Sequence, residues 1–271
     1  LLLRDIRPGS SGSNPSQFVP RGSRVYFSAD DGQHGAELWS SDGTRDGTLL
    51  VSDIVPGPSG SGPYRMVASD QAVFFTVSTP TVTGELWTSD GTEAGTRRLG
   101  GNDARELSVR GQDLFFTARD GEHGYELWIT DGTPTGTRVL KDLVPGSQPG
   151  SGSVGPGALR VVNQRLFFCA QDGPRGRELW VSDGTEAVTI PVRDIQPGAG
   201  SSSILSVLRL NGRALFVADD GTHGRELWVS DGTADGTMLV RDIGKWTASF
   251  LDSRVLNFSA AEAGGFLYFA A

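Results

Sequence analysis

The residues best suited to chemistry are a glutamate and a tryptophan that recur together along the chain. Glu-Leu-Trp occurs five times, and each copy leads into an Asp-Gly-Thr turn. A carboxylate can act as a general acid or base, but an active site is asymmetric, whereas this pair returns in every repeat. We interpret the pair as structural, with each buried Glu satisfied by backbone N–H groups of a turn or by an Arg. The residues are Glu37 and Trp39, Glu85 and Trp87, Glu126 and Trp128, Glu178 and Trp180, and Glu226 and Trp228.

The Asp-Gly-Thr turns are a second candidate site, because Asp-rich turns bind calcium. Asp and Thr also close local hydrogen bonds to the backbone, and Gly supplies a positive φ. The acidic residues are too sparse for a calcium loop, which needs alternating Asp or Asn ligands and a terminal Glu. We therefore predict that no cofactor is bound and keep calcium as the alternative.

The three histidines share one repeat position. His34, His123 and His223 each follow an Asp-Gly pair in the second turn of a repeat. Three His can bind zinc at bonds of about 2 Å, but these turns are expected to lie far apart. We predict turn residues and no metal site. The sequence has no zinc-protease or nucleophile-elbow motif, so no catalytic residue is predicted.

The connections between repeats break the symmetry, and loops on a rigid scaffold usually carry the binding residues. One connection, 100–106, is short and charged and contains Asp103 and Arg105. Another, 244–250, contains Trp246, the one Trp outside the Glu-Leu-Trp motif. Trp246 either stacks on a ligand or fills space in the core of the last repeat. Together with Tyr64, these three residues are the predicted ligand-binding set.

The repeat predicts the elements that position these residues. In the first repeat, strands are expected at 17–19, 24–29, 37–41 and 48–54, separated by Gly-, Asp- and Pro-rich turns. Four short antiparallel strands form the blade of a β-propeller, and we name them A to D from the axis outward. The prediction is one all-β domain over residues 1–271, with six blades as the main expectation and seven or five as alternatives. The expected blades are 7–54, 55–99, 100–143, 144–195, 196–243, and 244–271 together with 1–6.

The sixth blade is expected to be incomplete. Residues 1–6 resemble a lone strand D, and residues 255–271 resemble a lone A–B hairpin. Propellers often close by letting the N-terminal strand complete the last blade. The missing strand C is expected beyond residue 271, in a strand-donating partner, or replaced by the N-terminal strand.

The composition narrows the class of partner. The formal net charge is −8, which argues against nucleic acid and anionic membranes as partners. The single cysteine, Cys169, lies in a strand-like run and is expected to be buried and structural. No apolar run reaches the ~20 residues of a membrane span.

The repeated sequence resembles the ELWxxDGT repeat proteins, a bacterial family named after this signature. The matching residues include 37–44, with Asp53-Ile54-Val55-Pro56-Gly57 following, and 226–233. The resemblance implies a protein that is secreted, periplasmic or on the bacterial cell surface, and it supplies no catalytic residues. Repeat two departs from the pattern at 78–83, and repeat four has Glu186-Ala187-Val188 in its turn.

These observations favour a non-catalytic extracellular binding or scaffold module that mediates protein or surface interaction. A lectin-like propeller that binds glycans is the first alternative. A hydrolase or lyase that uses rim carboxylates such as Asp103 is the second, and it requires two converging carboxylates.

Overall fold

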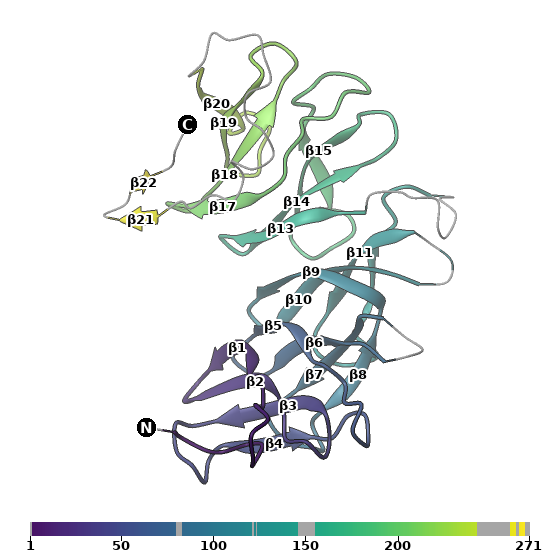
Figure 1. Cartoon of the computed structure of the whole chain (residues 1–271). Helices are drawn as coiled ribbons and strands as arrows, with labels where there is room; N and C mark the ends of the chain where they lie inside the picture. Colours follow the sequence, from purple (N-terminus) through teal and green to yellow (C-terminus); the bar gives the residue numbers. More distant parts are fainter. Residues whose placement is uncertain are drawn as a thin grey trace. The chain divides into compact units, whose positions relative to one another are not determined.

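The chain is built of consecutive four-stranded antiparallel sheets, which are blades of the β-propeller type (Figure 1). The computed structural model describes residues 2–79, 83–120, 122, 124–145, 155–242, 261–263 and 266–268. Within these ranges five complete sheets follow one another, each with its strands in sequence order. The predicted all-β fold class of the propeller type is thereby confirmed.

The strands of blade one lie where the sequence predicts them, at β1 (Ser16–Arg21), β2 (Arg24–Asp30), β3 (Ala36–Ser41) and β4 (Leu49–Ser52). The other blades repeat this order. Blade two is β5 (Tyr64–Ala68), β6 (Val73–Val77), β7 (Glu85–Ser89) and β8 (Arg97–Gly100); blade three is β9 (Asn102–Arg110), β10 (Asp113–Arg119), β11 (Tyr125–Thr130) and β12 (Arg138–Lys141); blade four is β13 (Gly157–Val162), β14 (Arg165–Gln171), β15 (Arg177–Ser182) and β16 (Ile190–Arg193); blade five is β17 (Val207–Leu210), β18 (Arg213–Asp219), β19 (Arg225–Ser230) and β20 (Met238–Arg241).

The A strands of blades one to four each contain a β-bulge. The register between strands A and B shifts after Ser16, Tyr64, Arg105 and Gly157. The residue that follows each of these has a positive φ, which costs strain in a non-glycine residue. These residues are Gln17, Arg65, Glu106 and Ala158.

The core lies between blades, where the Leu of one motif meets the Trp of the next. Leu38 shares an apolar cluster with Phe75 and Trp87. Equivalent clusters join blade two to blade three and blade four to blade five. Trp therefore packs between blades, as predicted. Cys169 is also buried, as expected.

Contacts divide the chain into two compact units, Leu1–Gly121 with Trp128–Arg138, and Glu122–Leu127 with Val139–Ala271. No helix in the described ranges is long and apolar enough to cross a membrane.

The two ends of the chain differ from expectation in different ways. Residues 2–6 form no strand, which corrects the prediction of a strand D there. A strand D is ordered by pairing with a strand C, and the described part of the chain offers residues 2–6 no such partner. Of the hairpin predicted over 255–271, the structure describes two paired strands, β21 (Ala261–Ala263) and β22 (Phe266–Tyr268), and the other residues of that range lie outside the described ones.

Candidate functional site

The carboxylate of Glu37 ties strand β3 to the connection that leads into blade two. Its buried side chain accepts hydrogen bonds from the N–H groups of Ile54 (3.2 Å), Val55 (3.1 Å) and Ser61 (2.8 Å), and from the Ser61 hydroxyl. A carboxylate offers about four acceptor sites. Four donors therefore saturate Glu37 and leave it no capacity for a substrate.

Blade four repeats this arrangement. Glu178 accepts from the N–H groups of Ile195 (3.1 Å), Gln196 (3.4 Å) and Ser202 (3.2 Å). Ser61 and Ser202 stand seven residues after the Ile of their Asp-Ile pair. The Glu of one blade thus fixes the connection that leads into the next blade.

Blade two satisfies its carboxylate differently. Glu85 pairs with Arg98 of strand β8 at 2.8 Å. Ala104 is the counterpart of Ser61 in blade two. Its N–H donates to the carbonyl of Gly84, the residue before Glu85, at 2.8 Å, and the Ser61 N–H donates in the same way to the residue before Glu37. Because alanine has no hydroxyl that could donate to the carboxylate, the Arg98 guanidinium is the partner of Glu85 instead. Both predicted arrangements, backbone N–H groups and Arg, therefore occur.

Burial dominates the electrostatics of these carboxyl groups. It raises the pKa of Glu178 to about 7, despite hydrogen bonds from Ile195, Gln196 and Ser202 that lower it. Burial also raises the pKa of Glu37 above its usual value, against four donors that favour the charged form. The cause is removal from water rather than a second carboxylate, so the shifts do not indicate a catalytic pair.

Each Asp-Gly-Thr turn closes on itself. In blade one, an Asp42 oxygen accepts from the Thr44 N–H (2.9 Å) and the Thr44 hydroxyl (2.7 Å). The Thr44 hydroxyl in turn accepts from the Gly47 N–H (2.9 Å), and the Thr48 hydroxyl donates to the Thr44 carbonyl (2.7 Å). The hydrogen bond from the Thr hydroxyl is the largest cause that lowers the pKa of this carboxyl. That lowering is found for Asp42, Asp90, Asp131 and Asp231.

One position of this turn is crowded in the four blades that have glycine there, at Gly47, Gly95, Gly136 and Gly236. A Cβ on Gly47 would come within 2.1 Å of all three carboxyl atoms of Asp42. Blade four has Val188 at this position, and its N–H lies 3.3 Å from the Thr185 hydroxyl, against 2.9 Å for Gly47 and Thr44 in blade one. Val188 is also exposed. The turn of blade four is therefore a looser version of the same motif.

His34 and His223 belong to turns, as predicted. His34 Nδ1 lies 2.7 Å from an oxygen of Asp31, and His223 Nδ1 lies 2.7 Å from an oxygen of Asp220. The hydrogen bond to Asp31 is the main cause that raises the pKa of His34. Arg175 takes the same position in blade four and pairs with Asp172 at 2.8 Å. An arginine is not a metal ligand, so what the position requires is a partner for the turn Asp.

The charged connection at 100–106 is different from the prediction. Residues 97–100 and 102–110 are strands β8 and β9, so Gly101 alone connects them. The pairing of β9 with β10 is irregular between Asn102 and Arg105 and again between Arg105 and Ser108. These bulges absorb the residues that the sequence assigned to a loop.

The structure brings three of the four predicted binding residues together. A Cβ built on Gly84 would lie 3.0 Å from the Cα of Asp103 and 3.1 Å from the Tyr64 hydroxyl. Arg105 forms a two-point ion pair with Asp103, and the Arg65 guanidinium lies 5.0 Å from the centre of the Tyr64 ring. We call Tyr64, Arg65, Asp103 and Arg105 the rim cluster.

The fourth predicted binding residue, Trp246, lies outside the residues that the structure describes, as does His123. The described residues contain no group of three or more His, Cys, Asp or Glu side chains that could hold a metal ion.

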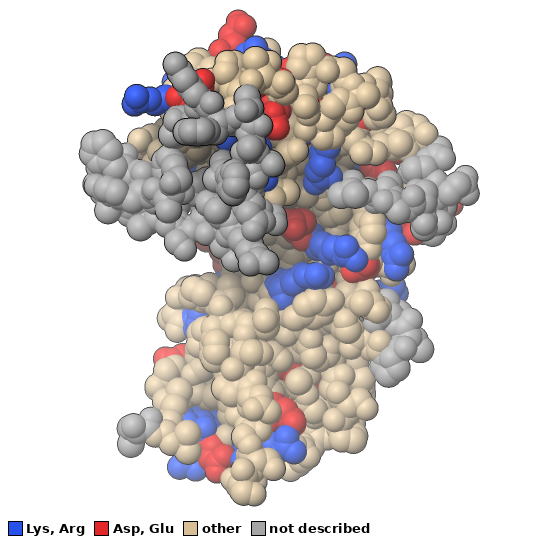
Figure 2. Space-filling view, turned by 45° about the horizontal axis from the view of Figure 1, so that its top comes forward, with Lys and Arg blue, Asp and Glu red and all other residues tan. Residues whose placement is uncertain are grey.

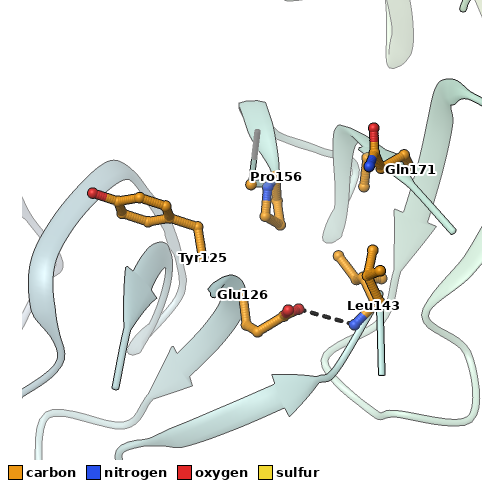
Figure 3. Close-up of a pocket in the computed structure, with 8 residues that line it drawn as sticks. Tyr125, Glu126, Leu143, Pro156 and Gln171 are labelled. Carbon is orange, nitrogen blue, oxygen red and sulfur yellow. Dashed lines mark hydrogen bonds between the residues drawn. The ribbon is translucent and has the colours of Figure 1, made fainter. Parts of the chain in front are cut away.

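A cavity lies beside the Glu of blade three. Tyr125, Glu126, Leu143, Pro156 and Gln171 are among its lining residues, and Glu126 accepts from the Leu143 N–H at 2.9 Å (Figure 3). The cavity measures about 10 Å³, which is room for one water molecule at most. It is too small to be a substrate pocket.

Sequence reasoning missed the groups that link neighbouring blades. Lys141 at the end of β12 donates to the Thr189 carbonyl (2.9 Å), and Arg193 at the end of β16 donates to the Thr237 carbonyl (2.9 Å). Arg4 makes the same contact with the Thr48 carbonyl of blade one. The signal was present, since each basic residue directly precedes an Asp followed by Ile or Leu.

The charges are dispersed on the face in view. Figure 2 shows acidic and basic side chains of the described residues next to one another, over several parts of that face. Ion pairs such as Arg7–Asp30 and Arg110–Asp113 also place opposite charges side by side.

No protein-family model and no curated protein match the chain. Among solved structures, it is similar to the computationally designed protein Ika8 (18% identity, TM-score 0.47), covering 84% of this chain and 60% of that one. It is also similar to TolB from Acinetobacter baumannii (13%, TM-score 0.43, 84% and 53%) and to a puromycin hydrolase mutant (15%, TM-score 0.47, 87% and 40%). The chain thus spans 60% or less of these structures. Such distant likenesses say nothing about activity.

Proposed function

We propose that this chain is a β-propeller of six blades that acts as a non-catalytic extracellular binding and scaffold module for protein or surface interaction. The observation that carries the proposal is the saturation of Glu37 by Ile54, Val55 and Ser61. A carboxylate whose acceptor sites are filled by backbone and hydroxyl donors holds a fold together and performs no proton transfer on a substrate.

The rim cluster is the proposed binding surface. It lies where blade two departs from the repeat, and its Arg105 side chain is 46% exposed. Arg105 is paired with Asp103, and Arg65 donates to the Ala104 carbonyl at 3.0 Å. Each guanidinium has five N–H donors, so the donors that these bonds do not use could bind a carboxylate of a partner. An acidic segment of a partner protein is the ligand that suits this surface best.

The same contacts give less support to the two alternatives. Arg65 stacks on the Tyr64 ring, whose face a sugar would need in a lectin. The carboxylate of Asp103 is paired with Arg105, whereas a glycosidase needs two converging carboxyl groups.

The proposed location is the bacterial cell surface, the periplasm or the medium. This rests on the resemblance of residues 37–44 and 226–233 to the ELWxxDGT repeat. Fractionation of cells that express the full-length natural protein tests it, and recovery in the cytoplasm alone would contradict it.

Assays of purified protein with ester, lactone and glycoside substrates test the absence of catalysis. We expect no turnover above background from the protein, and the same background from the Asp103→Asn variant. Turnover that a single rim substitution abolishes would contradict the proposal.

A further inference from the structure

Backbone strain gathers in and beside the rim cluster. Arg65, Asp103 and Glu106 have φ angles of 52°, 53° and 54°. Such angles are unfavourable for residues other than glycine, and they persist only where the surrounding contacts hold them in place. Strain of this kind often marks a functional site, so each of the three residues needs a physical reason for its conformation.

Asp103 lies in an irregularity that blade three alone has among the described blades. In blades one, two and four, the pairing of strands A and B shifts once, at the common bulge. In blade three it shifts at that bulge and a second time between Asn102 and Arg105, and Asp103 lies within this second shift. The common bulge therefore accounts for the strain of Arg65 and Glu106 but not for that of Asp103.

The second irregularity brings the Asp103 carboxylate against Arg105. Oδ1 of Asp103 accepts from Nε of Arg105 at 3.0 Å, and Oδ2 accepts from Nη2. The backbone of Asp103 is fixed from blade two, since its N–H donates to the Thr83 carbonyl at 3.0 Å. The Asp103 side chain is 13% exposed, whereas the Arg105 side chain is 46% exposed. A mostly buried acid thus neutralises a half-exposed base.

This ion pair has the geometry of a bound ligand. An arginine recognises a carboxylate best through two parallel N–H···O bonds from one edge of its guanidinium. Asp103 takes the edge formed by Nε and Nη2 of Arg105 in this way. A carboxylate of a partner can therefore make the same two bonds only by replacing Asp103.

Arg65 lies beside this pair and makes different contacts. Its Nη1 donates to the carbonyl of Ala104, the residue between Asp103 and Arg105, at 3.0 Å. Its guanidinium also lies over the Tyr64 ring, 5.0 Å from the ring centre. Both of these partners are uncharged, so the two contacts do not neutralise the positive charge of Arg65. Arg65 is therefore the group that an acidic partner meets first.

We propose that Asp103 is an internal competitor, which occupies Arg105 until an acidic segment of a partner protein displaces it. One carboxylate of the partner binds Arg65, a second replaces Asp103 on Arg105, and the Asp103 side chain turns to water. Segments with two neighbouring acidic residues are thereby favoured over segments with one. This inference rests on the proposed function, because it concerns the regulation of the rim cluster.

Titration with a hexaglutamate peptide tests the proposal on the full 271-residue chain, native and with Asp103→Asn. Asparagine tolerates a positive φ as aspartate does, but it cannot form the ion pair. We expect the variant to bind the peptide about fivefold more tightly at physiological salt, because the peptide no longer competes with a carboxylate for Arg105. A thermal midpoint close to that of the native chain checks that the variant is folded.

Asp113→Asn is the matched control. Asp113 also pairs with an arginine of strand β9, Arg110, at 2.7 Å, so its replacement changes the net charge by the same amount. Arg110 lies roughly 15 Å along the strand from Arg105, which exceeds the screening length of ~8 Å at physiological salt. We expect Asp113→Asn to change the affinity for the peptide by less than about twofold.

A double variant shows whether the gain passes through Arg105. In the Arg105→Ala background, Asp103→Asn should change the affinity by less than about twofold, because no guanidinium remains to be released. A gain of about fivefold that persists in this background would mean that Asp103 acts through its charge alone, and would overturn the proposal.

Equal affinities of Asp103→Asn and Asp113→Asn for the peptide would also overturn the proposal. The rim cluster would still be supported as a binding surface in that case if Arg105→Ala weakens the binding of the native chain. Failure of hexaglutamate to bind either the native chain or Asp103→Asn would contradict the rim cluster itself and the proposal built on it. The failure of this inference is therefore distinguishable from the failure of the proposed function.

Discussion

Blades one and two contain the same Glu-Leu-Trp strand but satisfy its Glu in different ways. In blade one, Glu37 is bound by backbone N–H groups and a Ser hydroxyl of the following connection. In blade two that connection is a single glycine, and Glu85 pairs with Arg98, whose side chain is 56% exposed. The comparison shows that the Glu must have a partner, but that the following connection determines which partner it has.

The largest expected effect separates these two carboxylates. Glu37→Ala leaves three N–H groups without their acceptor, and should lower the free energy of unfolding by about 3–5 kcal/mol. Glu85→Ala should cost only about 1–2 kcal/mol, because the exposed Arg98 can turn to water. Denaturant unfolding of both variants measures the difference. If both variants lose the same free energy of unfolding, the two blades do not differ in how strongly they depend on their Glu.

The second prediction uses pH. Because burial raises the pKa of Glu178 to about 7, the folded state keeps its proton where the unfolded state releases it. The stability contributed by the protonated group is complete below about pH 4.5 and is lost as pH rises through about 7, by up to ~3 kcal/mol. Unfolding midpoints from pH 4 to 8 should therefore fall more steeply for the native protein than for Glu178→Gln. If the midpoints of the two proteins fall in parallel with pH, the raised pKa of Glu178 is not the cause of the loss of stability.

The third prediction concerns the Asp-Gly-Thr turns of blades one and four. Gly47→Ala places a Cβ against the Asp42 carboxylate and should destabilise the protein by about 1–3 kcal/mol. Val188→Ala at the same position of blade four should change stability by less than about 0.5 kcal/mol, because Val188 is exposed and its turn is already looser. Thermal unfolding distinguishes the pair. If Gly47→Ala leaves the stability unchanged, the Asp42 side chain can move aside, and the third prediction is wrong.

The sequence predicted the strands well because local patterns specify them. The runs 24–29 and 37–41 are bounded by turn residues, and they form strands β2 and β3. The misassigned residues 102–106 and 2–6 have no such local signal. A bulge depends on the register with strand B, and a strand D depends on a strand C, so both are set by pairing partners.

Within the candidate site, the residue types were predictable but their partners were not. A buried Glu needs donors, and the sequence names Glu37 and Glu178. Ser61 and Ser202 lie in connections rich in Gly, Ser and Pro, where one Ser looks like another. Only the fold singles them out, by bringing each within 3.2 Å of its carboxylate.

The contacts of the basic residues should have a small effect. Arg193→Ala removes one bond to the Thr237 carbonyl between blades four and five and should cost about 0.5–1.5 kcal/mol. Arg209→Ala, in the exposed part of strand β17, serves as the control and should be neutral. Denaturant midpoints of the two variants are the measurement, and identical values would mean that the contact contributes nothing.

The smallest expected effect is that of metal removal. The Asp carboxylates of the turns are held by Thr44 and its equivalents, so a chelator should leave the thermal midpoint unchanged. A drop that calcium restores would favour the calcium alternative.

Amide hydrogen exchange in the Glu37→Ala variant tests the central claim most directly, namely that the repeated Glu is a structural link to the next blade. Exchange at Ile54, Val55 and Ser61 should accelerate by at least tenfold relative to the native protein, while Ile195, Gln196 and Ser202 of blade four keep their native rates. Unchanged exchange at the first three amides would contradict the account.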